Sequence, residues 1–100
     1  MRIISKRTLR RFWESNPKFE DSKGQLEAWH AEVIKADWNT PQDVKAQFRS
    51  ASIIKDSRVI FNIKGNDYRL IVKINYPYHI VYIRFIGTHK QYDQIDVENV

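Results

Sequence analysis

The stretch RVIFNIKGNDYRLIVKINYPYHIVYIRFI, residues 58–86, decides the fold. Its hydrophobic residues recur with period two, which is the spacing of side chains on one face of a β-strand. The alternation is interrupted by KGND, residues 64–67, which has the composition of a tight turn, and again by Pro77-Tyr78. The pattern predicts three antiparallel strands, over residues 58–63, 68–76 and 79–86.

The alternation also predicts what each face of this sheet carries. One face should be apolar and covered by helices, with Val59, Phe61, Ile63, Leu70, Val72, Ile74, Val81, Ile83 and Phe85. The other should be mixed and basic, with Lys64, Arg69, Lys73, Tyr82, Arg84 and Ile86. Cations beside aromatic rings such as Tyr68 and Tyr82 suit RNA, which offers phosphates and stacking bases. An ordinary solvated sheet face rich in Lys and Arg is the alternative.

Upstream of residue 58 the hydrophobic spacing is helical. Leu9, Phe12 and Trp13 stand at i, i+3 and i+4, which predicts a helix that Ser5 caps and Asn16-Pro17 ends. Further helices are expected after Ser22, with Gln25 as capping-box partner, and from Thr40-Pro41-Gln42-Asp43. Ile3-Ile4 suggests a short edge strand. Helices followed by an antiparallel meander predict the α+β class, with N-terminal helices packed on one face of a small antiparallel sheet.

Composition limits what such a chain can be. One hundred residues are expected to form one domain, residues 1–100. There are no cysteines, so disulfides, thiolate chemistry and zinc ribbons are excluded. No apolar run approaches the roughly 20 residues that a membrane span needs, and the N-terminus does not read as a secretory signal. We expect a cytoplasmic protein without membrane contact, and the net charge of +5 favours an anionic partner such as nucleic acid.

The segment GTHKQYD, residues 87–93, places several proton-transferring groups at the end of the last predicted strand. In a meander that strand end lies beside the start of the middle strand, so His89, Lys90 and Tyr92 should come near Arg69. An arginine can neutralise charge on a phosphorane while a histidine or tyrosine moves the proton. Because RNA supplies its own nucleophile, the 2′-hydroxyl, this set predicts a phosphodiester site that needs no metal or cofactor. No two histidines share a metal-ligand spacing.

These residues also carry a family resemblance. The motifs F-N-I-x-G-N-x-Y-R-L-I, Y-I-R and T-H-K-x-Y-D resemble the HigB family of toxin–antitoxin toxins, within the wider RelE-like mRNA interferases. The helical half is similar through W-x-x-P-x-D-V-K-x-x-F, residues 38–48. The likeness covers nearly the whole chain and is most specific in the last forty residues.

The resemblance implies an endoribonuclease that cleaves mRNA on the translating ribosome and is neutralised by a HigA-like helix-turn-helix antitoxin. It places Arg69 at the scissile phosphate, His89 and Lys90 at a catalytic basic position, and Tyr92 at the tyrosine of the terminal motif. It adds Lys64, on the first strand of the meander, and Asp93, which would orient a neighbour. Together with Lys73 and Arg84 of the basic face, these are the candidates for RNA binding. Gln91 departs from the family, in which a glutamate is frequent at this position.

Two questions stay open at this level. Either His89 or Tyr92 can act as the base, with Lys90 or the other residue as the acid. The same basic face also fits a non-catalytic RNA- or ribosome-binding module, and the basic helix face at residues 6–11 could dock an acidic protein. Binding of RNA without a cleaved product would favour the module.

Overall fold

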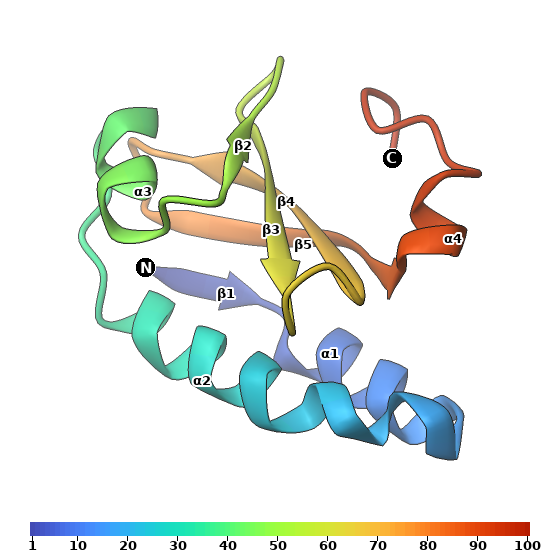
Figure 1. Ribbon diagram of the computed structural model, residues 1–100. Helices are drawn as coiled ribbons and strands as arrows, with labels where there is room; N and C mark the ends of the chain where they lie inside the picture. The colour runs from blue at the N-terminus through green and yellow to red at the C-terminus, as the bar shows by residue number, and fades with distance from the viewer.

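The predicted meander forms the centre of a larger sheet with strand order β1-β5-β4-β3-β2. We describe residues 1–100 in a computed structural model (Figure 1). Neighbouring strands are antiparallel except β1, which pairs in parallel with β5. The α+β class is therefore confirmed: the mixed sheet of five strands adds to the predicted meander the short edge strand expected at Ile3-Ile4 and one strand, β2, that was not predicted. The strands are β1 (Arg2–Ile4), β2 (Ser52–Ile53), β3 (Arg58–Ile63), β4 (Tyr68–Asn75) and β5 (Ile80–Thr88).

The helices precede the central strands, apart from one short turn of helix after β5. Figure 1 shows α1 and α2 running beneath the sheet, α3 beside β2, and α4 directly after β5. None of these helices is long and apolar enough to cross a membrane. The helical elements are α1 (Lys6–Ser15), the 3₁₀ helix η1 (Pro17–Ser22), α2 (Lys23–Ile34), α3 (Pro41–Gln47) and α4 (His89–Tyr92).

The core lies between the helices and one face of the sheet. Aromatic side chains fill its centre, where the ring of Phe61 lies 5.4 Å from Trp29 and 6.3 Å from Trp38 between centroids. The predicted apolar alternation on β3 and β4 is confirmed, because those side chains are buried in this core. The opposite face, which points away from α1 and α2, is called the open face below.

The last strand contains a β-bulge that the alternation did not predict. Ile71 pairs with Phe85 and Val72 pairs with Ile83, so Arg84 has no partner on β4. A bulge reverses the side-chain parity of the residues that follow it. The predicted sides of Phe85 and Ile86 were therefore wrong: Ile86 packs against the core, and Phe85 stands opposite Ile71 on the open face.

Two of the three predicted helix caps also differ from expectation. Thr40 and Asp43 form the predicted capping box at α3. Ser5 and Ser22 precede α1 and α2, but neither side chain makes a capping hydrogen bond. Ser22 Oγ donates to the Phe19 carbonyl at 2.6 Å, because η1 runs directly into α2 and leaves no free helix start. Gln25, the expected partner of Ser22, accepts instead from the Lys64 backbone N–H.

A polar network attaches the β3–β4 turn to η1. The Asp21 carboxylate accepts hydrogen bonds from the Tyr68 hydroxyl and from the Lys64 ammonium. Tyr68 is buried on the helix side next to Phe12, so its predicted place among the aromatics of the basic face was wrong. The pairing with Lys64 and Tyr68 lowers the pKa of Asp21, and the same pairing raises the pKa of Lys64. Burial, followed by the Asp21 carboxylate, raises the pKa of Tyr68 to about 12.

This network predicts how stability falls in alkali. A tyrosine whose pKa is raised from 10.0 to about 12 contributes stability that is complete below pH 10 and is lost as pH rises toward 12. Urea unfolding from pH 8 to 12 should show this loss. Tyr68→Phe should lower the free energy of unfolding at pH 8 by about 1 kcal/mol, through the lost hydrogen bond. It should also flatten the decline above pH 10. An unchanged alkaline slope in the variant would contradict this assignment.

Candidate active site

The segment after β5 is held in place by a capping box. The Gln91 backbone N–H donates to Thr88 Oγ1 at 3.1 Å, and Gln91 Oε1 accepts from the Thr88 N–H at 2.9 Å. These bonds begin α4 directly at the strand end, with His89, Lys90 and Tyr92 on its single turn. Glutamine and glutamate both fill this capping position. The departure at Gln91 therefore preserves a structural contact, which sequence reasoning missed although T-x-x-Q is a capping-box signal.

Gly87 makes room for this turn of helix. It pairs with Arg69 across the β4–β5 ladder. A Cβ at this position would lie 2.5 Å from Cζ of Phe85 and 2.7 Å from Oε1 of Gln91. Any side chain here would push the capping glutamine or the phenyl ring away. The absence of a side chain opposite Arg69 lets α4 fold close to the arginine.

The structure brings Arg69, His89, Tyr92 and Asp93 together; of the residues predicted to lie near Arg69, His89 and Tyr92 are in this group and Lys90 is not. The guanidinium carbon of Arg69 lies 5.8 Å from the centroid of the Tyr92 ring. The His89 and Tyr92 ring centroids are 6.2 Å apart. Nδ1 of His89 lies 3.1 Å from Oδ2 of Asp93. We call these four residues the terminal cluster.

Arg69 is held without an acidic partner. Its Nη1 donates to the backbone carbonyls of Asn66, at 3.2 Å, and Tyr68, at 3.4 Å. These bonds aim the guanidinium along the β3–β4 turn and leave its charge unneutralised, so it remains able to bind an anion. Arg69 is half-buried and His89 is exposed, so the cluster is accessible from solvent.

Two of the predicted cations, Lys90 and Lys64, form no hydrogen bond or ion pair with the terminal cluster. Lys90 is on the same turn of α4 and is exposed, but it contacts none of the four residues through a hydrogen bond or ion pair. Lys64 does not join the site, since its ammonium is paired with Asp21 at the helix side of the molecule. Lys64 also has a φ of 52°, because the turn takes it out of the strand alternation on which its predicted side rested.

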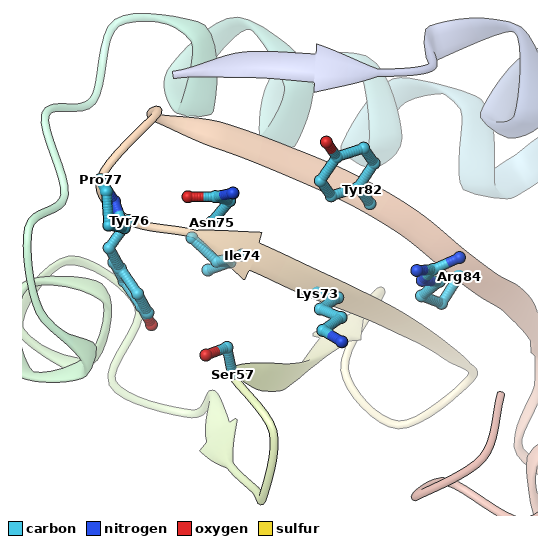
Figure 2. A pocket seen from close by; sticks show the side chains of 8 residues that line it. All are labelled: Ser57, Lys73, Ile74, Asn75, Tyr76, Pro77, Tyr82 and Arg84. Carbon is cyan, nitrogen blue, oxygen red and sulfur yellow. The ribbon is translucent and has the colours of Figure 1, made fainter.

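The remaining predicted RNA-binding cations line a pocket farther along the open face. Figure 2 shows Lys73 on β4 with Tyr82 and Arg84 on β5, around a pocket of about 400 Å³. Lys73 and Tyr82 are cross-strand partners. The guanidinium carbon of Arg84 lies 5.8 Å from the Tyr82 ring centroid. Ser57, Asn75, Tyr76 and Pro77 complete the rim, and sequence reasoning did not single them out.

The two groups of side chains lie on one face, at opposite ends of β4. Arg69 and Lys73 are four residues apart on this strand, which at about 3.3 Å per residue separates them by roughly 13 Å. The pocket does not include any residue of the terminal cluster. A long substrate such as a single-stranded RNA can reach both, with a phosphate at one end and a base at the other. No three His, Asp or Glu side chains gather as metal ligands.

The chain is similar to known proteins over most of its length. Residues 22–95 match the family described as HigB_toxin, RelE-like toxic component of a toxin-antitoxin system. The mRNA interferase toxin HigB of Escherichia coli K12 is 30% identical over 95 residues, covering 93% of this chain and 88% of the relative. The mRNA interferase HigB of Shigella flexneri gives the same values. Another, from Escherichia coli O6:H1 (strain CFT073), is 25% identical over 97 residues.

The close approach at Gly87 predicts a substitution that disturbs the terminal cluster while preserving the sheet. Gly87→Ala should displace the Gln91 cap and move Tyr92 away from Arg69. We expect unchanged far-ultraviolet circular dichroism but altered NMR shifts at His89 and Tyr92, together with weakened growth arrest. Gly24→Ala is the matched control, because a Cβ there meets nothing within 4 Å. Native shifts in Gly87→Ala would contradict the packing argument.

Proposed function

This chain belongs to the HigB family of RelE-like toxins, and we propose that its reaction is carried out by the terminal cluster without a metal ion. The family makes it an mRNA interferase toxin of a toxin–antitoxin system, an endoribonuclease that acts on mRNA. The alternative of a binding module without catalysis is thereby set aside. The proposed catalytic residues are Arg69, His89, Lys90 and Tyr92.

The single observation that supports this assignment is the contact between His89 and Asp93. With Nδ1 facing the carboxylate at 3.1 Å, the ring presents Nε2 outward for a substrate. A carboxylate repels phosphate, so Asp93 does not contact the RNA backbone. Its proposed role is to fix the orientation of the His89 ring. A base oriented by a third group is a common arrangement in general acid–base sites.

The proposed reaction is an internal transfer within the RNA. The 2′-oxygen attacks the adjacent phosphorus and forms the new P–O2′ bond, while the P–O5′ bond breaks. One residue of the pair His89 and Tyr92 takes the proton of the 2′-hydroxyl. The other, or Lys90, returns a proton to the leaving 5′-oxygen. The products are a 2′,3′-cyclic phosphate and a 5′-hydroxyl, so no electron donor or metal-bound water takes part.

Arg69 is the group that stabilises the transition state. Charge develops on the non-bridging phosphate oxygens as the phosphorane forms, and a fixed cation there lowers the barrier. Arg69 hydrogen-bonds only to uncharged groups, the Asn66 and Tyr68 carbonyls and the Asn66 side chain, so it can bind these oxygens without first breaking an ion pair. Lys73 and Arg84 are proposed to hold neighbouring phosphates along the open face. Lys64 was a candidate for this role, and its pairing with Asp21 makes it the weakest one.

The partners follow from the same proposal. The site has few groups that could position RNA, so a substrate that the ribosome already holds in place would be cleaved more readily. We therefore propose that the toxin cleaves mRNA on the translating ribosome in the cytoplasm. We also propose a HigA-like helix-turn-helix antitoxin as the neutralising partner.

The catalytic assignment is tested by mapping mRNA 5′ ends in cells that express the toxin or its variants. Wild type should give new in-frame cuts within translated regions. His89→Ala should reduce them about 100- to 10,000-fold, the range for loss of an acid–base group, and Arg69→Ala about 100- to 1,000-fold, the range for loss of a donor that stabilises the transition state. Arg49→Ala, an exposed arginine outside the cluster, is the control and should cut normally. Cuts at wild-type frequency from the folded double variant would refute the assignment.

The Asp93→Asn variant tests the orienting role of Asp93 separately from the catalytic role of His89. The amide oxygen can still accept a hydrogen bond from Nδ1 of His89 but carries no charge, so the ring keeps its orientation and cleavage should fall less than in His89→Ala. Purified enzyme at high concentration on single-stranded RNA without ribosomes should retain its activity in excess chelator and leave 2′,3′-cyclic ends. Loss of activity in chelator, restored by a divalent ion, would overturn the metal-free part of the proposal.

A further inference from the structure

Residues 94–100 return from α4 toward the start of β3. Figure 1 shows the chain turning back after α4, on the side of the sheet away from α1 and α2. At one end the segment follows α4, whose cap lies against Gly87, the partner of Arg69. At the other end, Nε and Nη2 of Arg58 donate to the Val100 carbonyl oxygen, at 3.3 and 3.1 Å. The two attachments define where the segment runs.

The strand register shows what lies between these attachments. Residues that pair across neighbouring strands point to the same face of a sheet. Three such rows cross the open face: Arg69 with Gly87, Ile60 with Ile71 and Phe85, and Arg58 with Lys73 and Tyr82. We call the second the apolar row and the third the Arg58 row. Because the apolar row lies between the other two, a segment that runs from Gly87 to Arg58 crosses it.

The apolar row is buried although α1 and α2 lie on the other face. Ile71 is 0% exposed and Ile60 is 7% exposed, yet neither belongs to the core between the sheet and the helices. Ile95 and Val97 are half-buried, also outside that core, and the polar residues that alternate with them are exposed. This alternation is the one expected of a segment that lays its apolar side chains on the row and turns its carboxylates to solvent.

A single side chain of the sheet is hydrogen-bonded to this segment. Apart from the two bonds of Arg58, the hydrogen bonds of residues 94–100 lie within the segment or reach back to α4. The Asp96 carboxylate accepts from the Glu98 N–H, at 3.1 Å, and from the Asn99 side chain. Segments with few buried contacts to the rest of the chain open locally at low free-energy cost. This segment can therefore leave the open face while the sheet stays folded.

We propose that residues 94–100 are an autoinhibitory strap, which RNA must displace before it can bind across the open face. The proposal rests on the proposed function, in which RNA follows this face from the terminal cluster to the Arg58 row. The strap lies on that path and carries the carboxylates of Asp96 and Glu98, which repel phosphates. Its Val100 carbonyl also occupies the Arg58 guanidinium. Binding of RNA and closure of the strap are therefore mutually exclusive.

The closed position and its release are tested by NMR with a nitroxide spin label on Glu98→Cys. The chain has no other cysteine, so the label attaches at one site. The amide signals of Ile60 and Ile71 should broaden more than that of Ala28, which lies on α2 at the other face. Saturation with a 2′-O-methyl RNA oligonucleotide, which lacks the 2′-hydroxyl and cannot be cleaved, should remove this difference. Equal broadening in the free protein, or a difference that persists with RNA bound, would overturn the proposal.

A second test weakens the strap without changing the net charge of the chain. Val97→Ser removes half-buried apolar surface from the strap, so the variant should bind the same oligonucleotide about fivefold more tightly, because the open form is more populated. Ile34→Ser is the control, since it removes an exposed apolar side chain on α2 and should bind as the wild type does. Wild-type affinity in Val97→Ser, or no binding by either chain, would reject the strap.

The strap and the catalytic assignment fail separately. Release of the strap by RNA in a chain that cuts no RNA would reject the catalytic assignment and keep the strap. Normal cutting by a chain in which Val97→Ser leaves the affinity for RNA unchanged would do the reverse.

Discussion

The ladder between β4 and β5 is the constraint on which the site depends. At one end it pairs Arg69 with Gly87, and at the other it pairs Lys73 with Tyr82. The bulge between these pairs keeps Ile83 and Ile86 in the core and leaves Arg84 free of the ladder. A straight ladder would exchange the sides of Phe85 and Ile86 and would turn Gly87 away from the face that carries Arg69. The bulge thus sets the register that places the terminal cluster relative to the pocket.

The elements that sequence could predict are those with local signals. Period two over residues 58–86 located the three long strands, and the Thr40 capping box located α3. The bulge was not predicted because Phe85 and Ile86 are both apolar. The alternation of side chains therefore could not show which of the two is buried. β2 has two residues, too few for a periodic pattern, and the parallel pairing of β1 depends on a contact almost eighty residues away.

The sequence could predict those residues of the site that neighbouring strands bring together. Antiparallel pairing alone brought the end of β5 to the start of β4, so the neighbourhood of Arg69, His89 and Tyr92 followed from topology. Lys64 was misplaced because a turn residue with positive φ leaves the alternation, and Asp21, its partner, lies 43 residues away.

Whether a basic side chain of this protein can bind RNA depends on the groups within the chain that it already contacts. Lys64 would have to give up a carboxylate, and Arg58 is buried with its guanidinium on the Val100 carbonyl, 3.1 Å away, and near Asp56. Arg69 gives up only hydrogen bonds to uncharged oxygens, and a phosphate returns bonds in which both partners are charged and which can be bidentate. Lys73 and Arg84 form no ion pair within the chain and lie on the same face. The net charge of the chain therefore does not indicate where RNA would bind. The positions of the carboxylates are more informative, because they show which cations are already neutralised.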